Sequence, residues 1–146
     1  MARCNSTRGA ALAADPADRR ALSGLAYSRF SLAEELSLQK KFAEAETNYR
    51  ESLRLRQEVI RQDGPKPANL MNLAEVQWCL AQSLLDQAEA ARAGRRQRLE
   101  EARRLLGQAL ATLEVKANAE LNPGLRADIA NLLLRAERLA GLSDPQ

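Results

Sequence analysis

The chain has 146 residues, a net charge of +3 and 45% apolar residues, which is enough for one domain with a hydrophobic core. Its charged residues, 28% of the total, are of mixed sign, a pattern that favours solubility over nucleic-acid binding. Histidine is absent, so the commonest general base and the commonest metal ligand are both missing, which argues against catalysis.

Helix-forming residues dominate the sequence and predict a nearly all-α fold. Ala, Leu, Arg, Glu and Gln are abundant, while aromatic residues make up only 3%. No stretch alternates apolar and polar positions with β-branched residues, as a strand would. The five prolines all lie where helices could start or where loops could form.

The first half of the chain contains two predicted helices. Residues 1–14 are polar and small, and we expect a flexible N-terminal segment there. Asp15-Pro16 marks the start of a helix, with a capping carboxylate and a proline in the first turn. This helix ends at Gln39–Lys41, where the apolar pattern stops. A second helix is predicted over Phe42–Ile60, before the stop at Gln62–Pro67.

The second half contains three further predicted helices and a polar tail at 142–146. A tail rich in Ala, Arg and Gln, at Ala88–Arg98, separates the third helix from the fourth. The breaks between helices and the final stop are placed by glycine and proline. The predicted elements are a helix from Pro67 to Leu85, one from Leu99 to Leu113, a break at Asn122–Gly124, and a helix from Leu125 to Leu139 that ends at Ala140-Gly141.

The second predicted helix presents one face that requires a partner helix. Phe42, Ala45, Tyr49 and Ser52 follow a spacing of three or four residues, so they share one side of an α-helix. Ala45 and Ser52 are small enough to let another backbone come close, and the two aromatic rings fill the space beside that contact. We expect the preceding helix to be the partner, with Ala33 against Ala45.

An internal repeat relates the first and third predicted helices at an offset of 48 residues. Six positions coincide as Leu, Ala, an aromatic residue, Leu, Ala and Leu: Leu25, Ala26, Phe30, Leu32, Ala33 and Leu36 match Leu73, Ala74, Trp78, Leu80, Ala81 and Leu84. Six matches at one fixed offset argue against a generic helical bundle.

The second and fourth predicted helices match at an offset of 57, so the second copy holds nine extra residues. We expect these in the Ala88–Arg98 region between its two helices. The last helix resembles a third first helix, because Ile129-Ala130 takes the place of Leu25-Ala26 at an offset of 104. No second helix follows it in this sequence.

The repeated unit resembles the tetratricopeptide repeat (TPR), in which two antiparallel helices pack against each other through small residues at fixed places. The small positions of that repeat match Ala33, Ala45 and Ser52 in the first copy and Ala81, Ala102 and Ala109 in the second. Its large positions match Leu32, Leu36, Phe42 and Tyr49, and then Leu80, Leu84, Leu99 and Leu106.

The resemblance covers residues 15–141, as repeat one (15–62), repeat two (63–118) and a capping helix (123–141). The spacing of 48 exceeds the usual length of about 34 residues. It is closer to the long variety in kinesin light chains and in large bacterial signalling proteins. The sequence also departs from the pattern at Arg29 and Gln77, where an aromatic residue is usual, and at Glu137, where a small residue is usual.

The resemblance implies an α-α superhelix, a right-handed solenoid of about two and a half repeats whose first helices line a concave groove. It implies a cytoplasmic, bacterial protein-interaction module that binds a protein or peptide ligand, as the scaffold or docking part of a larger assembly or signalling protein. The groove positions implied are Tyr27, Phe30, Glu34, Ser37, Glu75, Trp78, Gln82, Leu85, Asn131, Leu134 and Arg138.

The equivalent aromatic residues Phe30 and Trp78 leave two interpretations open. They form either an aromatic ladder for an apolar ligand side chain or packing inside the fold. An alternative function is homodimerisation through the C-terminal helix, in which an unpaired edge would bury Ile129, Leu132, Leu133 and Ala136 against another chain.

A basic cluster suggests a weaker alternative, contact with RNA or an acidic partner: Arg92, Arg95, Arg96, Arg98, Arg103 and Arg104. Glu89, Glu100 and Glu101 interleave with it and can pair with it, and no aromatic residue lies there for base stacking, which argues against nucleic acid. Adjacent carboxylates such as Glu34 and Glu35 diverge by about 100° on a helix, so we expect no convergent catalytic pair.

Cysteine content and hydropathy suggest a location. Two cysteines are too few for a disulfide framework or a metal cluster, and Cys79 lies in an apolar helical pattern typical of a buried thiol. No apolar run approaches a membrane span, and the first residues lack the apolar core of a secretory signal. We therefore expect a cytoplasmic chain with no membrane segment, no metal and no cofactor.

Overall fold

The computed structural model describes residues 16–114 and 123–142, and every element in these two ranges is an α-helix. The predicted all-α class is confirmed for this part of the chain. The predictions for residues 1–14, the cap at Asp15, the end of repeat two at 115–118 and the tail at 143–146 lie outside it. The helices are α2 (Pro16–Leu38), α3 (Phe42–Asp63), α4 (Pro67–Ala90), α5 (Arg95–Glu114) and α6 (Pro123–Leu142).

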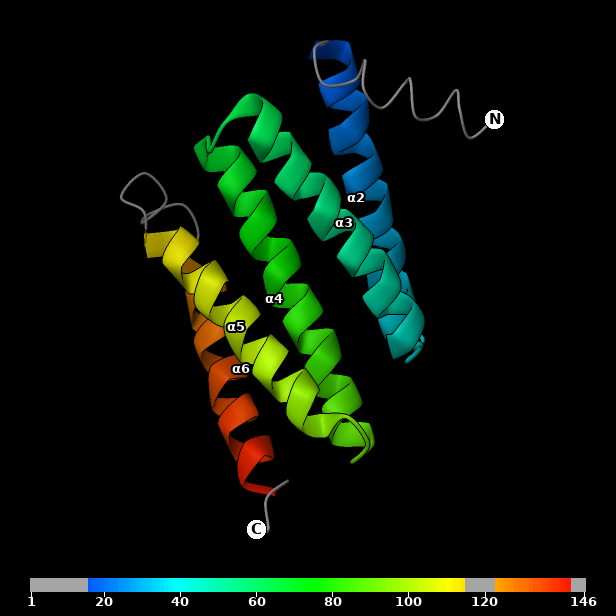
Figure 1. Ribbon diagram of the computed structural model, residues 1–146, viewed down its shortest axis with the longest axis vertical. Helices are drawn as coiled ribbons and strands as arrows, with labels where there is room; N and C mark the ends of the chain where they lie inside the picture. The colour runs from blue at the N-terminus through cyan, green and yellow to red at the C-terminus, as the bar shows by residue number, and fades with distance from the viewer. Residues whose placement is uncertain (1–15, 115–122, 143–146) are drawn as a thin grey trace.

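Consecutive helices run in opposite directions and lie side by side in chain order, from α2 at one edge to α6 at the other (Figure 1). Each helix packs on the one before it, and α6 also contacts α4. This packing is compatible with a repeat of helix pairs, in which α2 and α3 form the first pair and α4 and α5 the second. Within the two described ranges, no helix combines the length and apolarity needed to cross a bilayer.

The predicted contact between α2 and α3 is present, with small residues at its centre. Ala26, Ala33, Ala45 and Ser52 have no exposed surface, so the two backbones approach closely. The Ser52 hydroxyl donates a hydrogen bond of 2.8 Å to the Ala26 carbonyl oxygen, which satisfies a buried polar group. The equivalent small residues of the second pair are also fully buried: Ala74, Ala81, Ala102 and Ala109.

The turn between α2 and α3 is a Schellman motif built without glycine. Lys41 N–H donates to the Leu36 carbonyl at 2.8 Å, and Lys40 N–H donates to the Ser37 carbonyl at 2.9 Å. Lys40 takes the left-handed conformation that this motif requires, with φ 61°. A non-glycine residue in that conformation costs about 1 kcal/mol, because its Cβ approaches the backbone carbonyl.

The break expected within Ala88–Arg98 is present but shorter, because most of the extra residues of the second pair lengthen its two helices. α4 ends at Ala90, four residues beyond Asp86, the equivalent of Leu38. α5 begins at Arg95, four residues before Leu99, the equivalent of Phe42. Only Ala91–Gly94 lies outside a helix, and Gly94 adopts φ 71°, which glycine accepts without strain.

The same repeat position can be buried in one copy and exposed in the other. Leu80 of α4 is fully buried, whereas its equivalent Leu32 on α2 is 46% exposed. α4 packs between two neighbours, and Ser83 even donates a hydrogen bond to the Phe42 carbonyl of α3 at 3.3 Å. α2 packs chiefly on α3. The position that the buried Ser83 occupies on α4 is taken on α2 by the exposed Glu35, so this side of α2 is more polar than the same side of α4.

The last helix does not expose the edge expected from the sequence. Ile129 and Ala136 are fully buried, Leu132 is 9% exposed, and Leu133 packs against the same core. They pack within the chain because α6 lies on α5 and α4. The expectation that these residues remain free to contact another chain is therefore wrong. The exposed side of α6 instead carries Ala130, Leu134 and Glu137, which occupy the positions of Ala26, Phe30 and Ala33.

Candidate functional site

A cavity of about 420 Å³ opens between α2 and α4, the first helices of the two pairs. Its walls come from these two helices, and α3 contributes a single residue. The lining residues are Glu34, Glu35, Ser37 and Leu38 of α2, Tyr49 of α3, and Trp78, Cys79, Gln82, Ser83 and Asp86 of α4. Four of the residues proposed from the sequence as groove positions therefore meet in one cavity: Glu34, Ser37, Trp78 and Gln82.

The two equivalent aromatic residues have different environments. Phe30 is only 7% exposed, and its ring packs edge-on against Tyr49, with a centroid separation of 5.7 Å. It belongs to the core and does not line the cavity. Trp78 is partly exposed and forms part of the α4 wall. A ladder of two exposed rings is therefore absent, and Trp78 alone presents an indole to the cavity.

The remaining predicted groove residues lie outside the lining. Tyr27 is 64% exposed on α2, and Glu75 is exposed on α4. Leu85 is fully buried, so its assignment to a groove surface is wrong. On α6, Asn131, Leu134 and Arg138 are exposed but do not line this cavity. The cavity between α2 and α4 therefore covers only part of the face predicted to extend over all three first helices.

Sequence reasoning missed several lining residues. Leu38, 79% exposed, lies at the last position of α2, where the helical pattern gave no reason to single it out. Tyr49 and Cys79 were expected to be buried, and they are, but they also form part of the cavity wall. Burial raises the pKa of the Cys79 thiol well above its ordinary value, so the thiol stays protonated.

Carboxylates line the cavity without any lysine or arginine among the lining residues. Glu34 and Glu35 both contribute to the α2 wall, although adjacent positions on a helix diverge. Partial burial raises the pKa of Glu34, and the negative charges of Glu75 and Glu35 raise it further. Asp86 differs, because the Nη2 atom of Arg135 lies 2.8 Å from its Oδ1 atom. The uncompensated negative charge is therefore on the α2 wall.

The indole of Trp78 also has an unused donor. Its Nε1 atom is buried, and no hydrogen-bond acceptor reaches it from the part of the chain that the structure describes. A buried N–H without a partner costs about 1–3 kcal/mol, so such groups are uncommon in folded proteins.

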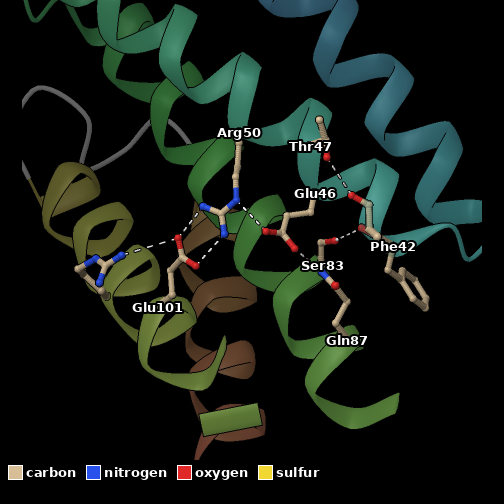
Figure 2. A network of polar contacts seen from close by, with 9 residues as sticks. Phe42, Glu46, Thr47, Arg50, Ser83, Gln87 and Glu101 are labelled. Atoms are coloured by element: carbon tan, nitrogen blue, oxygen red, sulfur yellow. Dashed lines mark hydrogen bonds and ion pairs between the residues drawn. The ribbon is translucent and has the colours of Figure 1, made fainter. Parts of the chain in front are cut away.

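A polar network joins the two helix pairs (Figure 2). The Arg50 guanidinium donates to both carboxylate oxygens of Glu101, at 2.6 and 2.7 Å, and links α3 to α5. Its Nε atom donates to Glu46 at 2.7 Å, and Gln87 of α4 donates to the other oxygen of Glu46 at 2.7 Å. The three helices α3, α4 and α5 therefore share one network, which links the first pair to the second.

The basic cluster of the second pair is largely occupied by contacts within the fold. Arg95 donates to the Ala88 carbonyl at 2.6 Å, and Arg98 donates to the Ala93 carbonyl at 2.7 Å, so both satisfy backbone groups where α4 ends. Two further members make ion pairs, Arg103 with Glu137 at 3.1 Å and Arg104 with Glu101 at 3.7 Å. These contacts weaken the case for a free phosphate-binding surface.

Comparison with family models, with curated proteins and with solved structures finds no match to this chain. The cavity and its charges are consequently the basis for assigning a function.

Proposed function

We propose that this chain is a protein-interaction module of the tetratricopeptide type, which binds a peptide segment or a partner helix between α2 and α4. The observation that carries the proposal is the open cavity of about 420 Å³ between the first helices of successive pairs. Its volume lies in the range of ligand-binding clefts. Its position on the side of the first helices is the one that the repeat resemblance implies.

The lining of the cavity supports recognition of a polypeptide. Trp78 offers a large, rigid contact surface, and Leu38 is an exposed apolar side chain on the opposite helix. Gln82 and Ser37 add donors and acceptors that can bond to a peptide backbone. The α4 wall belongs to a helix that the Arg50 network ties to α3 and α5, and the α2 wall packs on α3, so little ordering of the protein is needed on binding.

Self-assembly and RNA binding are less well supported. The apolar residues of α6 that self-assembly would use are buried inside the chain. The arginines that RNA binding would use include Arg95, Arg98 and Arg103, which bond to groups of the same chain. As the docking part of a scaffold or signalling assembly, the module would present its ligand without chemistry of its own.

The test is selection of a random peptide library, displayed on phage, against the immobilised protein. Trp78 is the only tryptophan of the chain, so a peptide that enters the cavity changes the intrinsic emission directly. We expect enriched peptides to shift that emission in a saturable titration. The substitution Gln82→Tyr narrows the cavity from an exposed position and should weaken binding at least tenfold.

The matched control is Gln97→Tyr, at an exposed position of α5 that does not line the cavity. It should leave binding unchanged. The proposal fails if no enriched peptide alters Trp78 emission, or if Gln82→Tyr and Gln97→Tyr have equal effects.

A further inference from the structure

The lining of the cavity between α2 and α4 carries charges of one sign. The chain carries a net charge of +3, yet the lining contains Glu34, Glu35 and Asp86 and no basic residue. A second cavity, of about 400 Å³, provides a comparison, because its lining contains both signs: Arg19 and Arg20 with Asp63. Negative charge is therefore concentrated where the proposed ligand would lie.

Local pairing does not relieve this charge on the α2 wall. The Asp86 carboxylate makes an ion pair with Arg135. Glu34 lies near the like charges of Glu75 and Glu35, and these charges and its partial burial all favour its protonated form. A positive charge placed in the cavity would favour the ionised form of Glu34, because an opposite charge within a few ångströms stabilises a carboxylate.

The α4 wall, opposite Glu34 and Glu35, is also suited to a positively charged group. Trp78 faces this cavity from α4, and the tryptophan ring is the best aromatic partner for a cation. Leu38, 79% exposed at the end of α2, can cover the aliphatic part of a long basic side chain. Carboxylates on one side, an indole on the other and an apolar rim form the environment that a lysine or arginine side chain requires.

We propose that the cavity receives a lysine or arginine side chain from a basic segment of a partner protein, with Glu34 and Glu35 as counter-charges and Trp78 as the aromatic wall. This rests on the proposed function, since it specifies the ligand of the same cavity. An acidic segment is disfavoured there, because its carboxylates would meet uncompensated negative charge.

A ligand-free measurement tests the electrostatic premise. Caesium and iodide ions both quench tryptophan emission, and a negative cavity attracts the cation and repels the anion. We expect caesium to quench Trp78 more effectively than iodide, relative to the same ions acting on free N-acetyltryptophanamide. The double substitution Glu34→Gln with Glu35→Gln should remove that difference. Equal or stronger quenching by iodide in the unsubstituted protein would overturn the proposal.

The peptides selected by phage display test the ligand. We expect them to be enriched in lysine and arginine, and their affinity to fall as salt is raised. The double substitution Glu34→Gln with Glu35→Gln should weaken their binding on the order of tenfold, since two partly exposed counter-charges are lost. Its matched control is Glu44→Gln with Glu100→Gln, which neutralises two exposed glutamates outside the cavity lining and should have no effect.

The outcomes separate this inference from the function on which it rests. If enriched peptides perturb Trp78 emission but are neutral or acidic, or bind equally well to the Glu34→Gln, Glu35→Gln protein, the basic ligand is excluded and the interaction module stands. If no peptide perturbs Trp78, both fail. Reversal of the charge by Glu34→Lys is a positive test, since the selected peptides should then lose their basic residues.

Discussion

Replacement of Phe30 by alanine tests whether this ring is part of the core or of a binding surface. Phe30 is 7% exposed and contacts Tyr49 edge-on. A core aromatic ring buries on the order of 150–250 Å², worth about 25 cal/mol per Å², and the alanine methyl group retains part of that. We expect Phe30→Ala to reduce the free energy of unfolding by about 3–5 kcal/mol, the usual range for such a cavity.

Urea denaturation followed by far-ultraviolet circular dichroism measures this loss. The matched control is Tyr27→Ala on the same helix, where the ring is 64% exposed and the effect should stay within about 0.5 kcal/mol. Trp78→Ala should fall between these two, because its indole is partly exposed. A loss below about 1 kcal/mol for Phe30→Ala would refute the assignment of this ring to the core.

Three further substitutions test local features of the fold. Ser52→Ala removes the buried hydrogen bond to the Ala26 carbonyl and should cost about 1 kcal/mol in urea denaturation; an unchanged midpoint would mean that this bond contributes nothing. Lys40→Gly relieves the left-handed backbone at φ 61° and should raise stability by about 0.5–1 kcal/mol, whereas a loss would contradict the strain. The hydrogen bonds from Arg50 lower the pKa of Glu101 below its ordinary value of 4.5, so the stability they provide is present above pH 4.5 and is lost as the pH falls through the folded-state pKa. Glu101→Gln should therefore make the denaturation midpoint less sensitive to pH in that acidic range, and an identical pH profile would contradict this linkage.

Local signals in the sequence were sufficient for the order of the helices and for the contact within each pair, but not for the full extent of α4 and α5. Proline and glycine positions mark where helices begin and stop, because they act through their own backbone conformations. Small residues at helical spacing identified the contact between α2 and α3, and Ala33, Ala45 and Ser52 are all fully buried there. The internal repeat then indicated that α4 and α5 pack in the same way. Each of these inferences depends on neighbours no more than one helix apart.

Positions that depend on the neighbouring pair could not be inferred in the same way. Leu32 and Leu80 are equivalent in sequence, but only Leu80 has a helix on each side, and only it is fully buried. Ile129 and Ala136 have the pattern of an unpaired apolar face, yet α5 and α4 cover them. A helical periodicity shows that a face is apolar without showing which other element covers it.

The candidate cavity was likewise only partly predictable from the sequence. The repeat resemblance indicated Glu34, Ser37, Trp78 and Gln82 as positions on one side of the first helices. Its negative charge emerged only when Glu34, Glu35 and the α4 wall were placed together, and the pair of helices behind α2 is linked to the next pair by a bond between Arg50 and Glu101, which are 51 positions apart. Contacts at such separations leave no periodic signal in the chain, because they are set by how one helix pair packs on the next.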